Sequence, residues 1–240
     1  MKVKGLILMV AVLTAFVCMP AVAMADTFTF TGGAGYGVYQ TGSGGEFTVR
    51  PGDRLNWILN NYDAKAKIGN ALQTFCLETN EYVWPNSTYS VVLSNATVYG
   101  GAGGAVDGRD PLSKGAAWLY NQFARGILQD YNYTDPTLRQ ASADALQKTI
   151  WWPEGEQVNP NNVFTQKVIS MFEEVGAKAD NNGAYPVMVA NLWEPGHLGE
   201  SGYQRQDQLI ASAAPIPPTV WLLGAGLFGV GFIRKRIKKS

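Results

Sequence analysis

The spacing of apolar residues changes twice along this chain, and this change restricts the possible folds more than any other feature. Between residues 27 and 100, short runs rich in Thr, Val, Tyr and Phe are separated by Gly, Pro and Asn, which is typical of antiparallel strands. In "EFTVR", Phe47 and Val49 alternate with polar residues and are expected to share one face. Strand-like sequence returns in "AYPVMVANLW" and "GYQRQDQLIAS" near the end.

Between about residues 111 and 179 the apolar residues recur at helical spacing in three successive segments. The second segment begins with Asp135-Pro136, an N-cap residue followed by proline at the first helical position. The sequence therefore predicts an α+β fold. We expect an antiparallel β-sandwich or barrel with an inserted three-helix segment.

Residues 1–25 have the pattern of an export signal. Lys2 and Lys4 precede an apolar run, and Ala23-Met24-Ala25 is a small-residue cleavage site. Cleavage after Ala25 removes Cys18 and leaves Cys76 as the one cysteine of the mature chain. Lipidation of Cys18 is the alternative, although bulky residues precede it. The signal predicts export through the inner membrane.

The other end of the chain predicts a membrane anchor. An apolar stretch from Thr219 to Ile233 is followed directly by a cluster of Arg and Lys. The stretch is short for a spanning helix, which usually needs about 17–25 residues, but counting from Pro217 brings it close. The basic cluster predicts that the tail stays on the cytoplasmic side.

Residues 213–240 resemble the PEP-CTERM sorting tail of Gram-negative, biofilm-forming bacteria. The resemblance rests on a proline pair, on Trp221-Leu222-Leu223-Gly224 and on the basic cluster. It implies recognition by an exosortase-type sorting enzyme at the inner membrane, and then either anchoring or release to the cell surface or extracellular matrix. Pro-Ile-Pro replaces the usual Pro-Glu-Pro, so cleavage of the tail stays open. The sorting residues implied are Pro215, Pro217, Arg234, Lys235 and Arg236.

Removal of both ends changes the charge of the chain. The full sequence has 19 basic and 19 acidic residues. Seven of the basic residues lie in the signal and the tail, so 12 basic and 19 acidic residues remain, a net charge of −7. An acidic domain repels phosphate backbones, so we expect no nucleic-acid partner.

The remaining part, residues 26–212, contains no familiar catalytic set. His197 is the only histidine and lies in a Gly/Pro loop, which favours a solvent-exposed position. Zinc sites need several Cys or His ligands, and the mature chain has one of each. We therefore predict that the protein is not an enzyme and binds no metal or cofactor.

Two short motifs resemble the thioester domain at the tips of Gram-positive surface adhesins and pili. Phe75-Cys76-Leu77-Glu78 matches the cysteine element of that family, and the run from Leu146 to Trp151 matches the glutamine element. The resemblance implies an internal Cys76–Gln147 thioester that captures amines, sheltered or assisted by Glu78, Phe75 and Trp151. Trp118, Tyr120 and Trp152 are further candidates for an apolar shelter.

The resemblance predicts an exported adhesive protein that attaches covalently to a surface amine or to exopolysaccharide. The alternative is a structural or carbohydrate-binding biofilm matrix protein without a thioester. In that case Cys76 is a buried small hydrophobe and "ALQKTIWW" is an ordinary helix end. Lys148, directly after Gln147, is either a surface charge or a competing amine.

Overall fold

The structure is a computed structural model that describes residues 25–32 and 44–213. The export signal and the sorting tail predicted from the sequence lie outside the described residues. Within the described residues, no helix is long and apolar enough to cross a membrane.

The main sheet contains seven antiparallel strands in the order β3-β4-β2-β1-β5-β8-β9. A separate hairpin pairs two further strands. The strands of the sheet are β1 (Asp26–Thr31), β2 (Phe47–Pro51), β3 (Lys67–Ile68), β4 (Ala71–Thr74), β5 (Thr88–Ser94), β8 (Val187–Trp193) and β9 (Gln204–Ala211), and those of the hairpin are β6 (Ala96–Val98) and β7 (Arg109–Pro111).

The sheet closes on itself because the residues that follow β4 pair with β9. The Leu209 N–H donates to the Phe75 carbonyl, and the Leu77 N–H donates to the Asp207 carbonyl, each at 3.0 Å. Cys76 lies between these two bonds, opposite Gln208. Closure removes the exposed sheet edge at this point and places Cys76 in the seam of a barrel.

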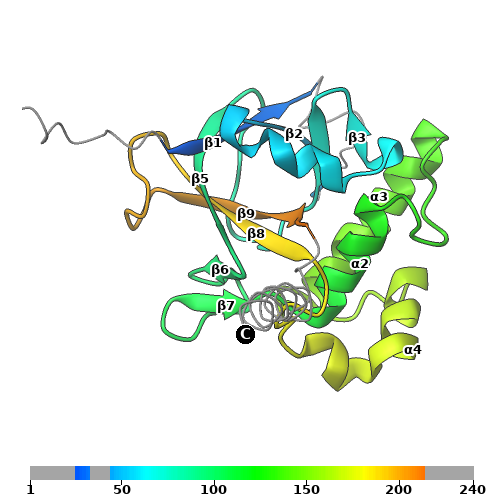
Figure 1. Cartoon of the computed structure of the whole chain (residues 1–240). Coiled ribbons are helices and arrows are strands. Elements are labelled where there is room, and N and C mark those ends of the chain that lie inside the picture. Colours follow the sequence, from blue (N-terminus) through cyan, green and yellow to red (C-terminus); the bar gives the residue numbers. More distant parts are fainter. Residues whose placement is uncertain (1–24, 33–43, 214–240) are drawn as a thin grey trace, which may run out of the picture.

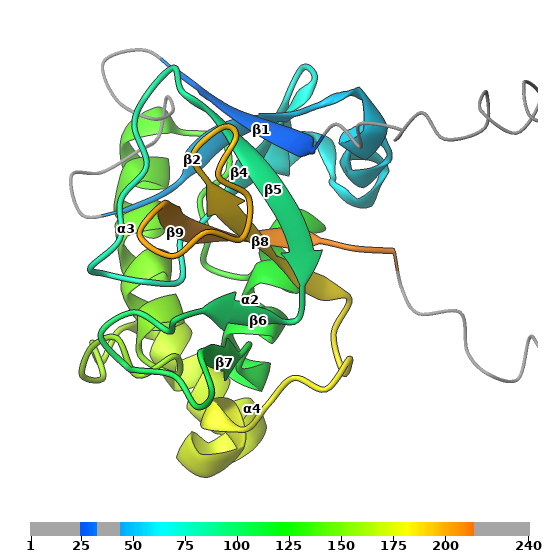
Figure 2. The ribbon, with the colours of Figure 1, turned by 90° about the vertical axis from the view of Figure 1, so that its left-hand side faces the viewer.

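Three helices follow the hairpin: α2 (Lys114–Ala124), α3 (Pro136–Trp151) and α4 (Val163–Lys178). They lie together on one side of the strands (Figure 1, Figure 2). Because β5 pairs directly with β8, the helices are an insertion between two neighbouring strands. The structure thus confirms the predicted α+β fold with an antiparallel sheet and an inserted three-helix segment.

The start of α3 agrees with the sequence prediction. The Asp135 carboxylate accepts hydrogen bonds from the N–H groups of Thr137 and Leu138 at 2.9 and 3.0 Å, and Pro136 occupies the first turn. Such a cap satisfies N–H groups that have no partner within the helix, and typically stabilises it by about 1 kcal/mol.

Two 3-10 helices, η1 (Asp53–Asn61) and η2 (Ala64–Ala66), were not expected from the sequence. They interrupt a region in which only strands were expected. Leu55 and Ile58 are buried and lie three residues apart, which suits a 3-10 turn. The neighbouring Thr- and Val-rich runs concealed this short helical pattern.

An aromatic core joins the barrel to α2. The Phe75 ring meets the rings of Phe123 and Tyr120 edge to face, with centroids 5.1 and 6.4 Å apart. Edge-to-face pairs add about 0.5–1.5 kcal/mol each beyond the area they bury. The seam strand that carries Cys76 is therefore fixed to the helical layer.

Candidate functional site

Cys76 is positioned by the barrel seam and is completely buried. Cys76 is the one free cysteine in the described part of the chain. The chain on both sides is bonded to β9, so the cysteine backbone has little freedom. A rigid backbone is needed if the thiol is to meet a reaction partner in a fixed geometry.

Gln147 is positioned by the buried face of α3. Arg139 and Ala143 are buried eight and four residues before Gln147, and Ile150 is buried three residues after it, which places them on one face with Gln147. The Gln147 side chain is 1% exposed. The helix therefore directs this amide toward the barrel and away from solvent.

The structure brings the two side chains together. The Cys76 Sγ lies 3.3 Å from Gln147 Oε1, and the Gln147 Nε2 donates a hydrogen bond to the Cys76 carbonyl at 2.8 Å. The same Oε1 accepts hydrogen bonds from the N–H groups of Cys76 and Gly45, both at 3.1 Å. The thiol, the amide and two converging N–H donors thus form one buried cluster.

The two N–H donors form a site that can stabilise negative charge on oxygen. Donors that already point at a carbonyl oxygen stabilise the charge that develops there when a nucleophile attacks the carbonyl carbon. Gly45 is 102 residues from Gln147 in the sequence, so its contribution is visible only in three dimensions. No sequence motif indicated this glycine.

Gly44 allows Gln147 to approach this closely. A Cβ atom at Gly44 would lie 2.6 Å from Gln147 Cγ and 3.0 Å from Gln147 Cδ. The φ angle of Gly44 is +127°, a conformation that residues with side chains rarely adopt. The site therefore requires glycine at this position for two separate reasons.

A buried ion pair holds Gly45 against α3. Glu46 is 0% exposed, and its carboxylate accepts two hydrogen bonds at 2.8 Å from the Arg139 guanidinium of α3. The Tyr131 hydroxyl donates to the same carboxylate. Arg139 lies on the same helix as Gln147, so this pair connects the Gly45 donor to the helix that carries its acceptor. We call Glu46, Arg139 and Tyr131 the clamp.

The thiol is not ionised in this environment. Burial raises the pKa of Cys76 well above its ordinary value of 9.0, and the nearby Glu78 carboxyl raises it further. The N–H groups of Cys76 and Gly45 and the Trp151 side chain lower the pKa, but less strongly than burial raises it. The Cys76 thiol must therefore lose its proton as the sulphur attacks, because the thiolate is the nucleophilic form.

Three of the aromatic residues named as a possible shelter are buried, namely Phe75, Tyr120 and Trp151. Trp151 lies one turn after Gln147 on α3. Trp118 and Trp152 lie elsewhere. The Trp118 ring packs against Phe172 of α4, and Trp152 lies beneath the Lys178 ammonium group.

Glu78 is close to the site but not bonded to it. Its Oε2 accepts a hydrogen bond from the Asp207 N–H at 2.8 Å, and its Oε1 is buried without a hydrogen-bond partner. Burial raises the Glu78 pKa well above 4.5, and the Asp207 and Glu81 charges raise it further. Burial likewise raises the pKa of Asp207 to about 7. Burial therefore favours the protonated form of Glu78.

Another buried carboxyl, that of Glu154, lies just after the end of α3. The Glu154 Oε1 accepts hydrogen bonds from the Ser113 N–H and hydroxyl, while Oε2 has no partner. Burial raises the Glu154 pKa to about 8. Within the described residues, no group of His, Cys, Asp and Glu side chains could hold a metal ion.

Two further residues resolve questions that the sequence left open. The Lys148 ammonium group forms a surface ion pair with Asp144 at 2.7 Å, so it points away from the thiol. His197 is 39% exposed, stacks on Tyr203 and pairs with Glu200 at 2.9 Å. His197 contacts neither Cys76 nor Gln147. The sorting residues Pro215, Pro217, Arg234, Lys235 and Arg236 lie outside the described residues.

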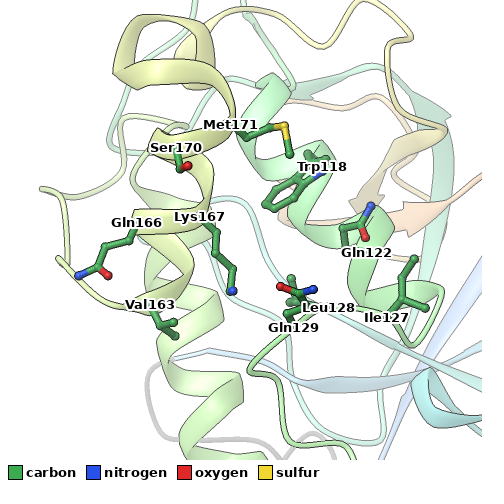
Figure 3. A pocket seen from close by; sticks show the side chains of 10 residues that line it. All are labelled: Trp118, Gln122, Ile127, Leu128, Gln129, Val163, Gln166, Lys167, Ser170 and Met171. Atoms are coloured by element: carbon green, nitrogen blue, oxygen red, sulfur yellow. The ribbon is translucent and has the colours of Figure 1, made fainter.

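A pocket of about 510 Å³ lies between α2 and α4, apart from the Cys76–Gln147 pair (Figure 3). The sequence analysis did not predict it, because its polar side chains look like the solvated face of two amphipathic helices. Its lining consists of Trp118 and Gln122 from α2, Ile127, Leu128 and Gln129 from the following loop, and Val163, Gln166, Lys167, Ser170 and Met171 from α4.

Comparison with family models, with curated proteins and with solved structures gives no match for this chain. The function must therefore be argued from the geometry and chemistry of the site.

Proposed function

We propose that Cys76 and Gln147 form an internal thioester and that the protein is a surface adhesin that captures amines through this bond. One observation carries the proposal. The Gln147 carbonyl oxygen lies between the N–H groups of Gly45 and Cys76, with the Cys76 sulphur 3.3 Å from it. This arrangement presents an amide carbonyl to a thiol and supplies donors for the oxygen of the intermediate.

Bond formation balances without any outside reagent. The Cys76 sulphur attacks Gln147 Cδ, and the carbonyl electron pair moves onto Oε1, where the two N–H groups stabilise the charge. The Cδ–Nε2 bond then breaks, the thiol proton ends on nitrogen and ammonia leaves. The sulphur and the amide are both at most 1% exposed, which supports the proposal because a buried thioester is protected from hydrolysis.

When a target is captured, the Cys76 sulphur is the leaving group instead of the nucleophile. A primary amine attacks Gln147 Cδ, the S–Cδ bond breaks, and a proton from the amine ends on the Cys76 sulphur. The target then remains attached through a stable amide at Gln147. Because the pair is buried, the amine can reach it only when the surrounding chain opens locally.

The proposed setting is the outer surface of a Gram-negative cell. Residues 1–25 would direct export through the inner membrane, and residues 213–240 would serve as a PEP-CTERM-like anchor read by an exosortase-type enzyme. The target would be a surface amine or an amine-bearing exopolysaccharide. A mature N-terminus at Asp26 and recovery of the protein in the membrane or matrix fraction would test this setting.

Amine labelling tests the proposed function. We expect a biotinylated primary amine to label the purified protein, with the label on Gln147 and a newly reactive thiol at Cys76. The Cys76→Ala variant should take up no label. Equal labelling of both proteins, or label only at other residues, would contradict amine capture by this bond.

A further inference from the structure

The pocket between α2 and α4 has polar side chains that the protein itself does not use. Gln122, Gln129, Gln166 and Ser170 line it, and none of their side chains makes a hydrogen bond to another described residue. Figure 3 shows these side chains on both helices and on the loop after α2, with Gln166 extending from the side of α4 that faces away from the Trp118 ring. Three amides and a hydroxyl thus offer donors and acceptors to whatever enters.

The pocket carries no unpaired charge. Its one ionisable lining residue, Lys167, forms an ion pair with Asp130 at 2.6 Å. A charged ligand would therefore find no free opposite charge here. A purely apolar ligand would take the amides out of water without giving them partners, at a cost of about 1–3 kcal/mol for each group. The lining suits a neutral ligand with many hydrogen-bonding groups.

One wall of the pocket is aromatic. The Trp118 indole is half-buried and held edge to face against Phe172, with ring centroids 5.9 Å apart, and it projects into the pocket (Figure 3). A flat, fixed ring presents an apolar surface at little cost in conformational entropy. Met171 and Val163 extend this apolar surface along α4.

We propose that this pocket binds a neutral saccharide. A pyranose ring has an apolar C–H face for the indole and hydroxyl groups around its edge for the amides. The volume of about 510 Å³ lies within the roughly 300–1,000 Å³ range of small-molecule sites. The inference does not depend on the Cys76–Gln147 bond, because none of the lining residues contributes to that pair.

Ligand-observed saturation-transfer NMR on the whole protein tests the proposal. The probes are the neutral disaccharides maltose, cellobiose, lactose and N,N′-diacetylchitobiose. We expect at least one to give a signal that falls at least tenfold in the Gln122→Ala/Gln166→Ala double variant and in Trp118→Ala. The matched control is Gln140→Ala, an exposed glutamine of α3 outside the pocket, which should keep the full signal. Cys76→Ala should also keep it.

Several results would overturn the inference. They are silence from all four disaccharides, a signal that survives in the double variant, and a pocket covered by a peptide or by a second copy of the chain. Trp118→Ala removes a ring from the α2–α4 interface, so its folding is checked by thermal unfolding. If it does not fold, the double glutamine variant decides, because both of its side chains lie at the surface.

Discussion

Gln147 and Gln122 lie on neighbouring helices, but their amide groups have opposite surroundings. Gln147 is 1% exposed, its oxygen accepts two N–H bonds and the Cys76 thiol, and its nitrogen donates to a carbonyl. Gln122 lines an open pocket and its side chain bonds to no described residue. The same functional group is thus fully engaged in hydrogen bonds within the chain in one place and left without a partner among the described residues in the other.

The difference shows that placement, not residue type, sets what an amide can do. An amide in water does not react with a thiol at a useful rate. Preorganised donors and exclusion of water make up for this only where the backbone holds every group in position. The predictions below test whether Gln147 depends on its surroundings in this way.

The largest effect is expected when the leaving group is changed. Gln147→Glu replaces the amide by a carboxyl group that cannot expel ammonia, so bond formation and amine labelling should be lost completely. Gln122→Glu, at the pocket, should leave labelling unchanged. The measurement is uptake of biotinylated amine. Labelling of Gln147→Glu at the original rate would contradict the claim that the Gln147 amide, unlike that of Gln122, is the group that reacts.

The second effect is on the clamp. Arg139→Met leaves the Glu46 carboxylate buried without its guanidinium partner, and such losses cost about 3–5 kcal/mol. Urea unfolding measures this. Lys178→Met is the control, because the exposed Lys178–Glu174 pair contributes at most about 0.5 kcal/mol and the Lys178–Trp152 contact about 0.5–1 kcal/mol. In molecules that remain folded, amine labelling should also slow, since Gly45 loses its attachment to α3. Unchanged labelling would show that the clamp does not position Gly45.

The third effect concerns the closest approach to Gln147. Gly44→Ala places a Cβ 2.6 Å from Gln147 Cγ in a strained backbone conformation, so we expect a loss of about 1–3 kcal/mol and reduced labelling. Gly69→Ala is the matched control, because its φ is also positive at +58° but its Cβ would meet no atom within 4 Å. If both variants lose labelling equally, the contact with Gln147 does not matter.

The smallest effect concerns the buried Glu154 carboxyl, which titrates whereas the Cys76–Gln147 pair stays neutral. Burial raises the Glu154 pKa from its ordinary value of 4.5 to about 8. The folded state therefore binds more protons than the unfolded chain between these values, and the stability present below pH 4.5 is lost as pH rises to 8. One pKa unit corresponds to about 1.4 kcal/mol, so the free energy of unfolding should fall by at least about 1 kcal/mol between pH 5 and pH 8.

Chemical denaturation at several pH values measures this fall, and Glu154→Gln should make the profile flatter. A free energy of unfolding that rises over the same range would show that the Glu154 carboxyl is ionised in the folded state.

The order of strands and helices could be predicted from the sequence because it depends on local periodicity. The cap at Asp135 was predictable for the same reason. The Cys76–Gln147 pair was suggested only by a resemblance of two short motifs. Gly45 and the Glu46–Arg139 pair were not predictable, because they join segments 102 and 93 residues apart that share no motif. The pocket was missed because unpartnered glutamines on a helix face look the same in sequence whether they meet water or a ligand.

The most direct test of the central claim is the intact mass of the purified protein beside its Cys76→Ala variant, which has the same ends. We expect the wild-type protein to be one ammonia lighter than its sequence requires, and methylamine to add to it, giving a product one methylene group heavier than the sequence mass. The variant should have the full mass of its sequence. A full mass for the unmodified protein, with a Cys76 thiol that reacts on unfolding, would contradict the thioester.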